Sequence, residues 1–95
     1  MKHIEINGKE YPFKVSYSVI RKVMSMGLQG ELDQAHFICV EAINKGLRME
    51  GKEPTMTGNL LDDLIDEDPL AMERLTAAID EQQKTEGGSA EDEGK

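Results

Sequence analysis

The sequence predicts an α+β fold, in which an N-terminal β-hairpin packs on a small bundle of three to four α-helices. Three observations lead to it. Apolar and polar residues alternate over 3–15, apolar residues recur at helical spacing over most of 16–84, and residues 85–95 are acidic with few apolar side chains. We therefore expect one domain over residues 1–84 and a disordered acidic tail over residues 85–95.

The stretch HIEINGKEYPFKV (3–15) is typical of a β-hairpin, because apolar residues occupy every second position on both sides of a glycine. A hairpin of two strands is marginal in water when it stands alone, so its apolar face must pack on helices or on another chain. The alternating apolar residues are Ile4, Ile6, Tyr11, Phe13 and Val15.

Two tight turns compete for the centre of this hairpin. With Asn7-Gly8 as the turn pair, Ile6 would face Lys9; with Gly8-Lys9, Ile6 would face Tyr11. We favour Gly8-Lys9, since glycine in first position suits a type II′ turn and we expect this register to keep one face apolar.

Pro12 marks the second strand as an edge strand, because proline cannot donate a ladder hydrogen bond. The other edge, formed by residues 3–6, is then the better template for an added strand. A peptide or a second copy of the chain could pair there.

The first expected helix is SYSVIRKVMSMG (16–27), with Ser16 or Ser18 as its N-cap and Gly27 at its end. Its apolar residues form a stripe of helical spacing that should face the core. They are Val19, Ile20, Val23 and Met24. Met26, Met49 and Met56 lie near helix ends or in loops and are expected to be exposed.

The longest expected helix is ELDQAHFICVEAINKGLRME (31–50). Gly46 weakens its last turn, so the helix ends there or continues to about residue 49. One face carries the apolar stripe, which contains Leu32, His36, Cys39, Val40, Ile43 and Leu47.

Phe37 and Ile38 point away from that stripe, among polar residues that include Glu41 and Lys45. Either the hairpin or the last helix buries these two residues, or they stay exposed as the anchor for a partner. Aromatic anchors ringed by polar residues are a common centre of interfaces. We therefore assign the candidate partner-binding surface to Phe37, Ile38, Glu41 and Lys45.

Two shorter segments complete the bundle. NLLDDLID (59–66) is expected to be a helix capped by Thr57, with Leu60, Leu61, Leu64 and Ile65 on its apolar face. DPLAMERLTAAIDEQQK (68–84) is expected to be the last helix, with Asp68 as N-cap and Pro69 at the first helical position. Its apolar stripe contains Ala71, Met72, Leu75, Ala78 and Ile79.

The densest group of carboxylates in the chain lies between these two helices, at Asp62, Asp63, Asp66, Glu67 and Asp68. The group lacks the spacing of a calcium loop. Because leucines interleave with the acids, we expect the acids to be the solvated side of a helix and the cap of the next, not a metal site.

His36 and Cys39 are one helical turn apart, which is a zinc-ligand spacing, but zinc requires about four ligands. The chain has one further histidine, His3, and no second cysteine. We therefore expect a core histidine beside an inert buried thiol. No catalytic, metal or cofactor site is expected, and the chain is interpreted as no enzyme.

Charge is divided unevenly along the chain. The net charge is −8, with +2 on residues 1–52 and −10 on residues 53–95. An acidic chain is repelled by phosphate backbones and by anionic membranes, so neither is expected as a partner. One cysteine, no apolar run of membrane-spanning length and no signal-like N-terminus favour an intracellular, soluble protein.

The opening IEINGKEYPFKVSYSVIRKV, the small helices after it and the ending LLDDLIDEDPLAMERLTAAIDEQQK with its acidic tail resemble the small tail assembly chaperones of long-tailed bacteriophages and prophages. The similarity covers roughly residues 1–84. It rests on the order of the elements more than on any single motif.

The resemblance implies a non-catalytic protein that binds the tape measure protein while the tail tube polymerises around it. The major tail protein is a second candidate partner, and self-association is open. It also implies action in the cytoplasm of the bacterial host and absence from the mature virion.

Two other classes of function stay open. One is a small acidic adaptor or regulatory module, such as a nucleic-acid mimic, which would need a spaced ladder of carboxylates on an ordered surface. The other is a metal-dependent enzyme, which titration with calcium, magnesium or zinc would reveal.

Overall fold

The computed structural model describes the backbone of residues 1–91 and the side chains of residues 1–83. Its elements are β1 (Lys2–Ile6), β2 (Lys9–Phe13), α1 (Tyr17–Ser25), α2 (Glu31–Met49), α3 (Gly58–Glu67) and α4 (Ala71–Glu91). The predicted α+β fold, an antiparallel hairpin packed on four helices, is confirmed. The predicted tail covers residues 85–95. The backbone of residues 85–91 continues α4, and residues 92–95 lie outside the described residues. The disorder of the tail therefore stays a prediction.

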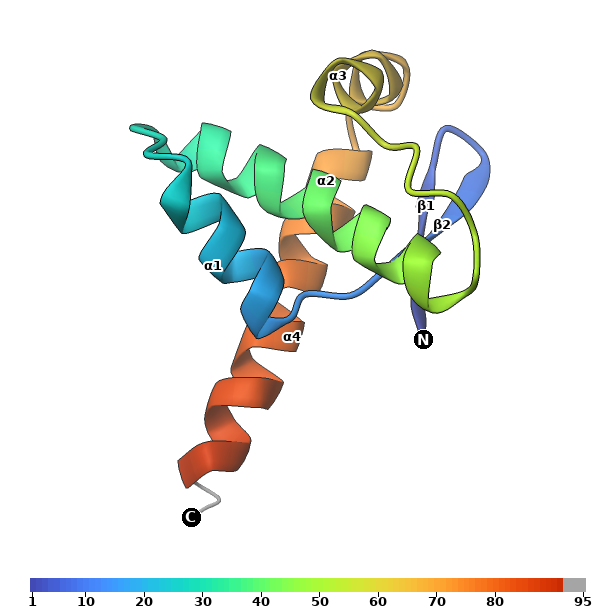
Figure 1. The fold of residues 1–95 in the computed structure, drawn as a ribbon. Helices are drawn as coiled ribbons and strands as arrows, with labels where there is room; N and C mark the ends of the chain where they lie inside the picture. The colour runs from blue at the N-terminus through green and yellow to red at the C-terminus, as the bar shows by residue number, and fades with distance from the viewer. Residues whose placement is uncertain (92–95) are drawn as a thin grey trace.

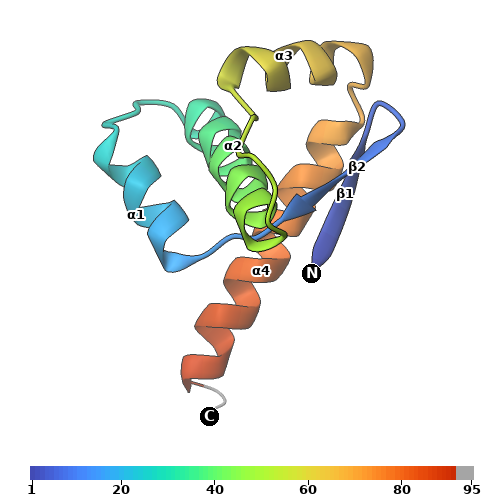
Figure 2. The same cartoon turned by 45° about the vertical axis from the view of Figure 1, so that its right-hand side comes forward.

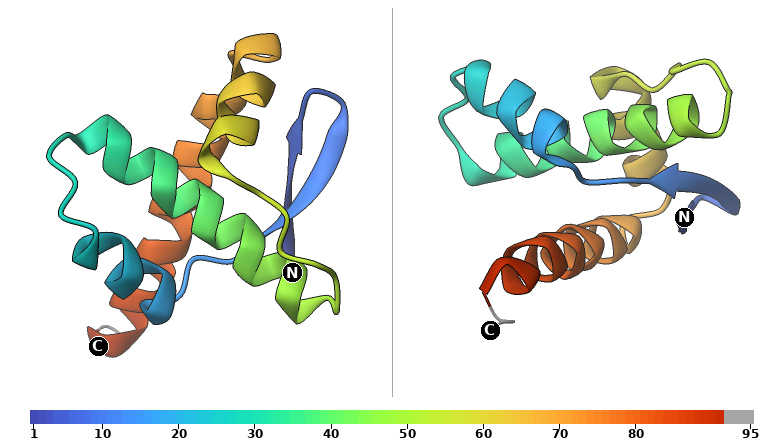
Figure 3. Two further views of the ribbon diagram at one scale, coloured as in Figure 1. Left: turned by 45° about the horizontal axis from the view of Figure 1, so that its top comes forward. Right: turned by 60° about the horizontal axis from the view of Figure 1, so that its bottom comes forward.

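Helix α2 crosses the molecule between α1 and the hairpin, with α4 running behind it (Figure 1). Helix α3 lies at one end, above α2 and the start of α4 (Figure 2). Strand β2 contacts α2, and strand β1 contacts α4. The segment from β2 to α1 passes between the layers of α2 and α4, as the right-hand view of Figure 3 shows.

The core lies where the hairpin, α2 and α4 meet, and α3 and the loop before it close one side. The predicted stripe of α4 is confirmed, since four of its five residues are buried and Met72 packs on the core. Val19 and Val23 of α1 are also buried. The main cluster of buried residues contains Ile4, Ile6, Phe13, Val15, Cys39, Val40, Ala42, Ile43, Met56, Leu61, Ala71, Leu75, Ala78 and Ile79.

The hairpin turn is Asn7-Gly8, so the predicted Gly8-Lys9 turn is wrong. Ile6 pairs with Lys9 and not with Tyr11. The φ angles of 51° at Asn7 and 83° at Gly8 are both positive, as a type I′ turn requires, and Asn-Gly adopts that pair of angles at low cost. The two registers differ by two residues and therefore keep the same side chains on the apolar face. Turn chemistry, not apolar alternation, decides between them.

The edge of β1 that we expected to be open is partly used by the chain itself. Helix α4 lies against β1, and Arg74 Nε donates to the Glu5 carbonyl at 3.0 Å. Pro12 pairs with His3 on the neighbouring strand. Counted from the turn, that pair is a non-hydrogen-bonded one, so the missing N–H of Pro12 removes no bond between the strands.

Gly46 does not end α2, which continues to Met49. A Cβ atom at Gly46 would lie 2.8 Å from the carbonyl carbon and the Cβ of Pro12. The glycine therefore allows the backbone of β2 to approach the helix closely. Just beyond β2, the Lys14 N–H donates to the Ala42 carbonyl of α2 at 3.1 Å.

Two amide side chains clamp backbone groups that would otherwise be buried without partners. Asn44 of α2 donates to the Met56 carbonyl and accepts from the Met56 N–H, both at 2.9 Å. Gln82 of α4 donates to the Phe13 carbonyl at 3.1 Å and accepts from the Val15 N–H at 2.6 Å. Met56 is consequently buried, so its predicted exposure is wrong.

Asp68 is the C-cap of α3, not the side-chain cap of α4, and α4 begins at Ala71, so that prediction is wrong. Its carboxylate accepts from Arg74 Nη2 at 2.5 Å and from the Asn7 N–H of the hairpin turn at 2.9 Å. The side chain of Arg74 in the next helix and the amide of Asn7, which is far away in sequence, therefore take the place of the local cap.

The other predicted helix starts hold. Ser16 accepts from the Val19 N–H, and Thr57 accepts from the Leu60 N–H at 3.1 Å. The predicted stripes extend too far at three positions, since Met24 is 69% exposed, Leu32 is 71% exposed and Leu60 of α3 is 41% exposed. Met24 and Leu32 lie toward the α1–α2 connection, where no further element of the described residues covers them.

Gly46→Ala should destabilise the protein although alanine favours helices. The new methyl group must displace the Pro12 backbone, and overpacking of this kind typically costs about 1–3 kcal/mol. Alanine recovers about 1 kcal/mol of helix propensity, so a net loss of up to about 2 kcal/mol is expected in urea unfolding.

Gly30→Ala is the control, because a Cβ at Gly30 meets nothing within 4 Å. Its effect should stay within about 1 kcal/mol. An equal effect of both substitutions would contradict the packing explanation.

Candidate functional site

An open cleft lies between α2, α3 and the start of α4, with a volume of about 350 Å³. We call it the α2–α3 cleft. Its lining residues are Leu32, Asp33, His36, Phe37, Gly58, Asn59, Asp62, Ile65 and Met72. Phe37, Ile65 and Met72 are partly buried against the core, whereas Leu32 at the rim is 71% exposed. The cleft thus combines an apolar floor with a rim that is mostly polar.

The first turn of α3 fixes the aromatic part of this floor. The rings of His36 and Phe37 meet edge to face, with centroids 5.1 Å apart. A Cβ at Gly58 would lie 3.3 Å from His36 Cε1 and 3.4 Å from ring atoms of Phe37. Glycine at the start of α3 therefore lets this helix sit directly on the two rings.

His36 also faces a carboxylate of α3. Its Nε2 lies 2.9 Å from Asp62 Oδ1, close enough for an ion pair when the imidazole is protonated. The geometry does not make a hydrogen bond, and this buried nitrogen has no other partner among the described residues. His36 is therefore a residue of the cleft, not the core histidine beside Cys39 that we expected.

The four residues of the predicted partner-binding surface lie in three different places. Phe37 lies in the α2–α3 cleft, and Ile38 lies between α1 and α4 beside Ile20 and Ile79. Glu41 and Lys45 line a separate groove between α1 and α2. Phe37 and Ile38 are both partly buried against the core, and their role in binding stays a prediction.

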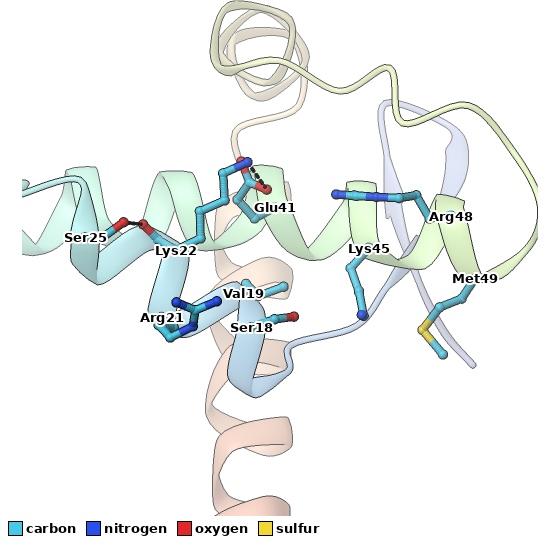
Figure 4. A pocket seen from close by; sticks show the side chains of 9 residues that line it. All are labelled: Ser18, Val19, Arg21, Lys22, Ser25, Glu41, Lys45, Arg48 and Met49. Carbon is cyan, nitrogen blue, oxygen red and sulfur yellow. Dashed lines mark hydrogen bonds and ion pairs between the residues drawn. The ribbon is translucent and has the colours of Figure 1, made fainter.

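The groove that contains Glu41 and Lys45 has a volume of about 500 Å³, and we call it the α1–α2 groove (Figure 4). Its lining residues are Ser18, Val19, Arg21, Lys22, Ser25, Glu41, Lys45, Arg48 and Met49. Four of the side chains are cationic and one is a carboxylate, which gives the lining a net charge of +3. Lys22 Nζ pairs with Glu41 Oε1 at 3.2 Å.

The acidic cluster at the end of α3 is arranged as expected from the interleaved leucines. Asp62, Asp63, Asp66 and Glu67 are exposed, while Leu61 is buried beneath them. The described residues contain no group of three or more His, Cys, Asp and Glu side chains placed to hold a metal ion. None of the helices in the described part of the chain is long and apolar enough to cross a membrane.

The sequence pattern missed Leu32 as a surface residue, because its spacing matches the buried stripe of α2. Its position in the first turn of the helix was the available signal, since helix ends commonly extend beyond the elements that cover their middle. The sequence pattern also placed the residues of the cleft on three separate helices and could not show that they meet.

Comparison with protein-family models, with curated proteins and with solved structures gave no match for this chain.

Cys39 should be unreactive in the folded protein. It is fully buried, and burial raises the pKa of its thiol from 9.0 to about 12. At pH 8 the folded protein should react with a thiol reagent only after unfolding, whereas in concentrated urea the thiol should react at the rate of a free cysteine.

The same pKa shift has a defined sign in the pH dependence of stability. The neutral thiol is favoured in the folded state, so its contribution is complete below pH 9 and is lost as the pH rises from about 9 to about 12. Rapid labelling of Cys39 under folding conditions would contradict its burial.

Proposed function

We propose that this chain is a non-catalytic tail assembly chaperone of a long-tailed bacteriophage or prophage, which binds the tape measure protein during tail morphogenesis. The proposal starts from the resemblance over residues 1–84. It places the protein in the cytoplasm of the bacterial host and outside the mature virion. The major tail protein is a second partner in this proposal.

The observation that carries the proposal is the α2–α3 cleft. An apolar floor that contains an aromatic ring, beside an exposed leucine and charged rim residues, has the composition of a helix-binding groove. Phe37 and Met72 supply the floor, and Leu32 supplies an apolar rim that the described part of the chain leaves uncovered. A long helical client offers an apolar stripe that would cover these groups.

Only side chains that are at least partly exposed can contact a partner, and the α2–α3 cleft contains such side chains. Fully buried groups such as Leu75 maintain the fold and have no surface to offer. Leu32 and Leu70 are the opposite case, because each is more than half exposed and contributes little to the core. Of these two residues, Leu32 lies in the cleft and Leu70 does not. Comparing substitutions at the two positions therefore distinguishes binding in the cleft from an effect of any exposed leucine.

A second candidate function, an acidic adaptor that mimics nucleic acid, has one observation in its favour. The exposed acids of α3 form two pairs at helical spacing, Asp62 with Asp66 and Asp63 with Glu67. Such a ladder on an ordered helix could occupy a basic groove of a partner. Loss of partner binding after Asp63→Asn/Glu67→Gln, with no effect of Leu32→Ser, would favour this function.

Leu32 and Phe37 should differ in their effects on stability. Leu32→Ser removes a largely solvated side chain and should change the free energy of unfolding by less than about 0.5 kcal/mol. Phe37→Ala removes a partly buried ring and should cost about 2–3 kcal/mol, below the value for a fully buried phenylalanine. Urea unfolding of both variants measures this difference, and a stability-neutral Phe37→Ala would show that the ring is a surface group.

Co-expression with the tape measure protein tests the proposed function. The client to test is a tape measure protein, a very long helical protein that we expect to be encoded after this chain, with a major tail protein encoded before it. Affinity capture of this chain should retain the client, and Leu32→Ser should abolish or strongly reduce that capture. Leu70→Ser is the matched control and should retain the client.

Failure to capture the client with the wild-type chain would contradict the chaperone proposal. If Leu32→Ser and Leu70→Ser reduced capture of the client equally, the chain would still bind the client, but not through the α2–α3 cleft.

A further inference from the structure

We propose that the α1–α2 groove binds an acidic peptide segment, with carboxylates on its cationic side chains and an apolar side chain against Met49. The groove lies on the side of α2 toward α1, whereas the α2–α3 cleft lies toward α3. The inference therefore does not depend on the proposed binding of the tape measure protein.

The first argument is where uncompensated positive charge lies. Lys2, Lys22, Lys52 and Arg74 each form an ion pair with a carboxylate, and Lys9 lies over the Tyr11 ring at 5.3 Å from its centroid. Lys14 also has a partner. Among the described side chains, the cations without an ion pair or ring contact are Arg21, Lys45 and Arg48.

All three of these cations line the same groove. Arg21 comes from α1, and Lys45 and Arg48 come from α2, so the groove has positive charge on both walls (Figure 4). The chain as a whole has a net charge of −8, so a groove lined mainly by cations is opposite in sign to the rest of the molecule. Scattered solvated lysines would not gather on two helices around one hollow.

The second argument concerns the size and lining of the groove. A volume of about 500 Å³ exceeds the space that one small anion would fill and suits several side chains of a peptide. Met49 at one end is 56% exposed, which offers an apolar contact beside the charges. Arginine side chains can hold carboxylates through two parallel hydrogen bonds, whereas the lysine acts as a point charge.

Nucleic acid presents the same charge but fits the molecule less well. A polynucleotide extends far beyond one groove and would meet the field of the acidic half of the chain, which carries −10 over residues 53–95. A short acidic peptide contacts the groove alone. The observations therefore favour a peptide of glutamate or aspartate with one or more apolar residues.

Binding can be measured with a short fluorescein-labelled peptide of glutamates and leucines, using fluorescence anisotropy on the full chain. Its counterpart with glutamine at every glutamate controls for apolar binding. The glutamate peptide should bind and be released by added salt, since exposed charges are screened. The glutamine peptide should bind at least about tenfold more weakly.

Two triple variants of equal net charge locate the binding site. Arg21→Gln/Lys45→Gln/Arg48→Gln removes the groove cations, and Lys2→Gln/Lys9→Gln/Lys52→Gln removes three cations elsewhere. The groove variant should lose at least about tenfold in affinity and the control variant less than about threefold. Thermal unfolding and the circular dichroism spectrum of both variants show that the fold is intact.

Three results would overturn the proposal. Equal losses of peptide affinity in the two triple variants would show that binding depends on net charge and not on the groove. Tighter binding of a single-stranded oligonucleotide than of the glutamate peptide would assign the groove to nucleic acid. Self-association that only the groove variant abolishes, seen by sedimentation, would assign the groove to the acidic surface of a second copy.

Discussion

The close contact between Gly46 and Pro12 is the constraint on which the arrangement of the other elements depends. The absence of a side chain at Gly46 brings the backbone of β2 onto α2, where any Cβ would be 2.8 Å from Pro12. This approach places the Lys14 N–H within hydrogen-bonding distance of the Ala42 carbonyl. The hairpin, which would be marginal alone, thereby becomes part of the helical core.

Polar side chains then fix the elements around this contact. Gln82 holds the end of β2 against α4, Asn44 holds the loop before α3, and Asp68 with Arg74 holds the hairpin turn. In each case a backbone amide or carbonyl of a strand, turn or loop bonds to a side chain from another part of the fold. Directional bonds of this kind specify one arrangement, whereas apolar burial alone tolerates several.

Helix α2 separates two surfaces of different chemistry. Toward α3 it presents His36 and Phe37 in a cleft with an apolar floor, and toward α1 it presents Lys45 and Arg48 in a cationic groove. A client helix and an acidic segment could therefore be bound at the same time without competing for the same residues. The exposed acids of α3 add a third, negatively charged surface beside the cleft.

The sequence by itself determined the elements and their order, because alternation, helical spacing and the caps Ser16 and Thr57 are local properties of the chain. It also determined that the acids of α3 face water, since leucines take the opposite side. The chemistry of the Asn7-Gly8 turn, also a local property, set the hairpin register. Tertiary structure alone decided the role of Asp68 and the separation of Phe37 from Glu41 and Lys45. These features depend on contacts between residues far apart in the chain, and a pattern of spacing contains no information about which helix will cover which side of another.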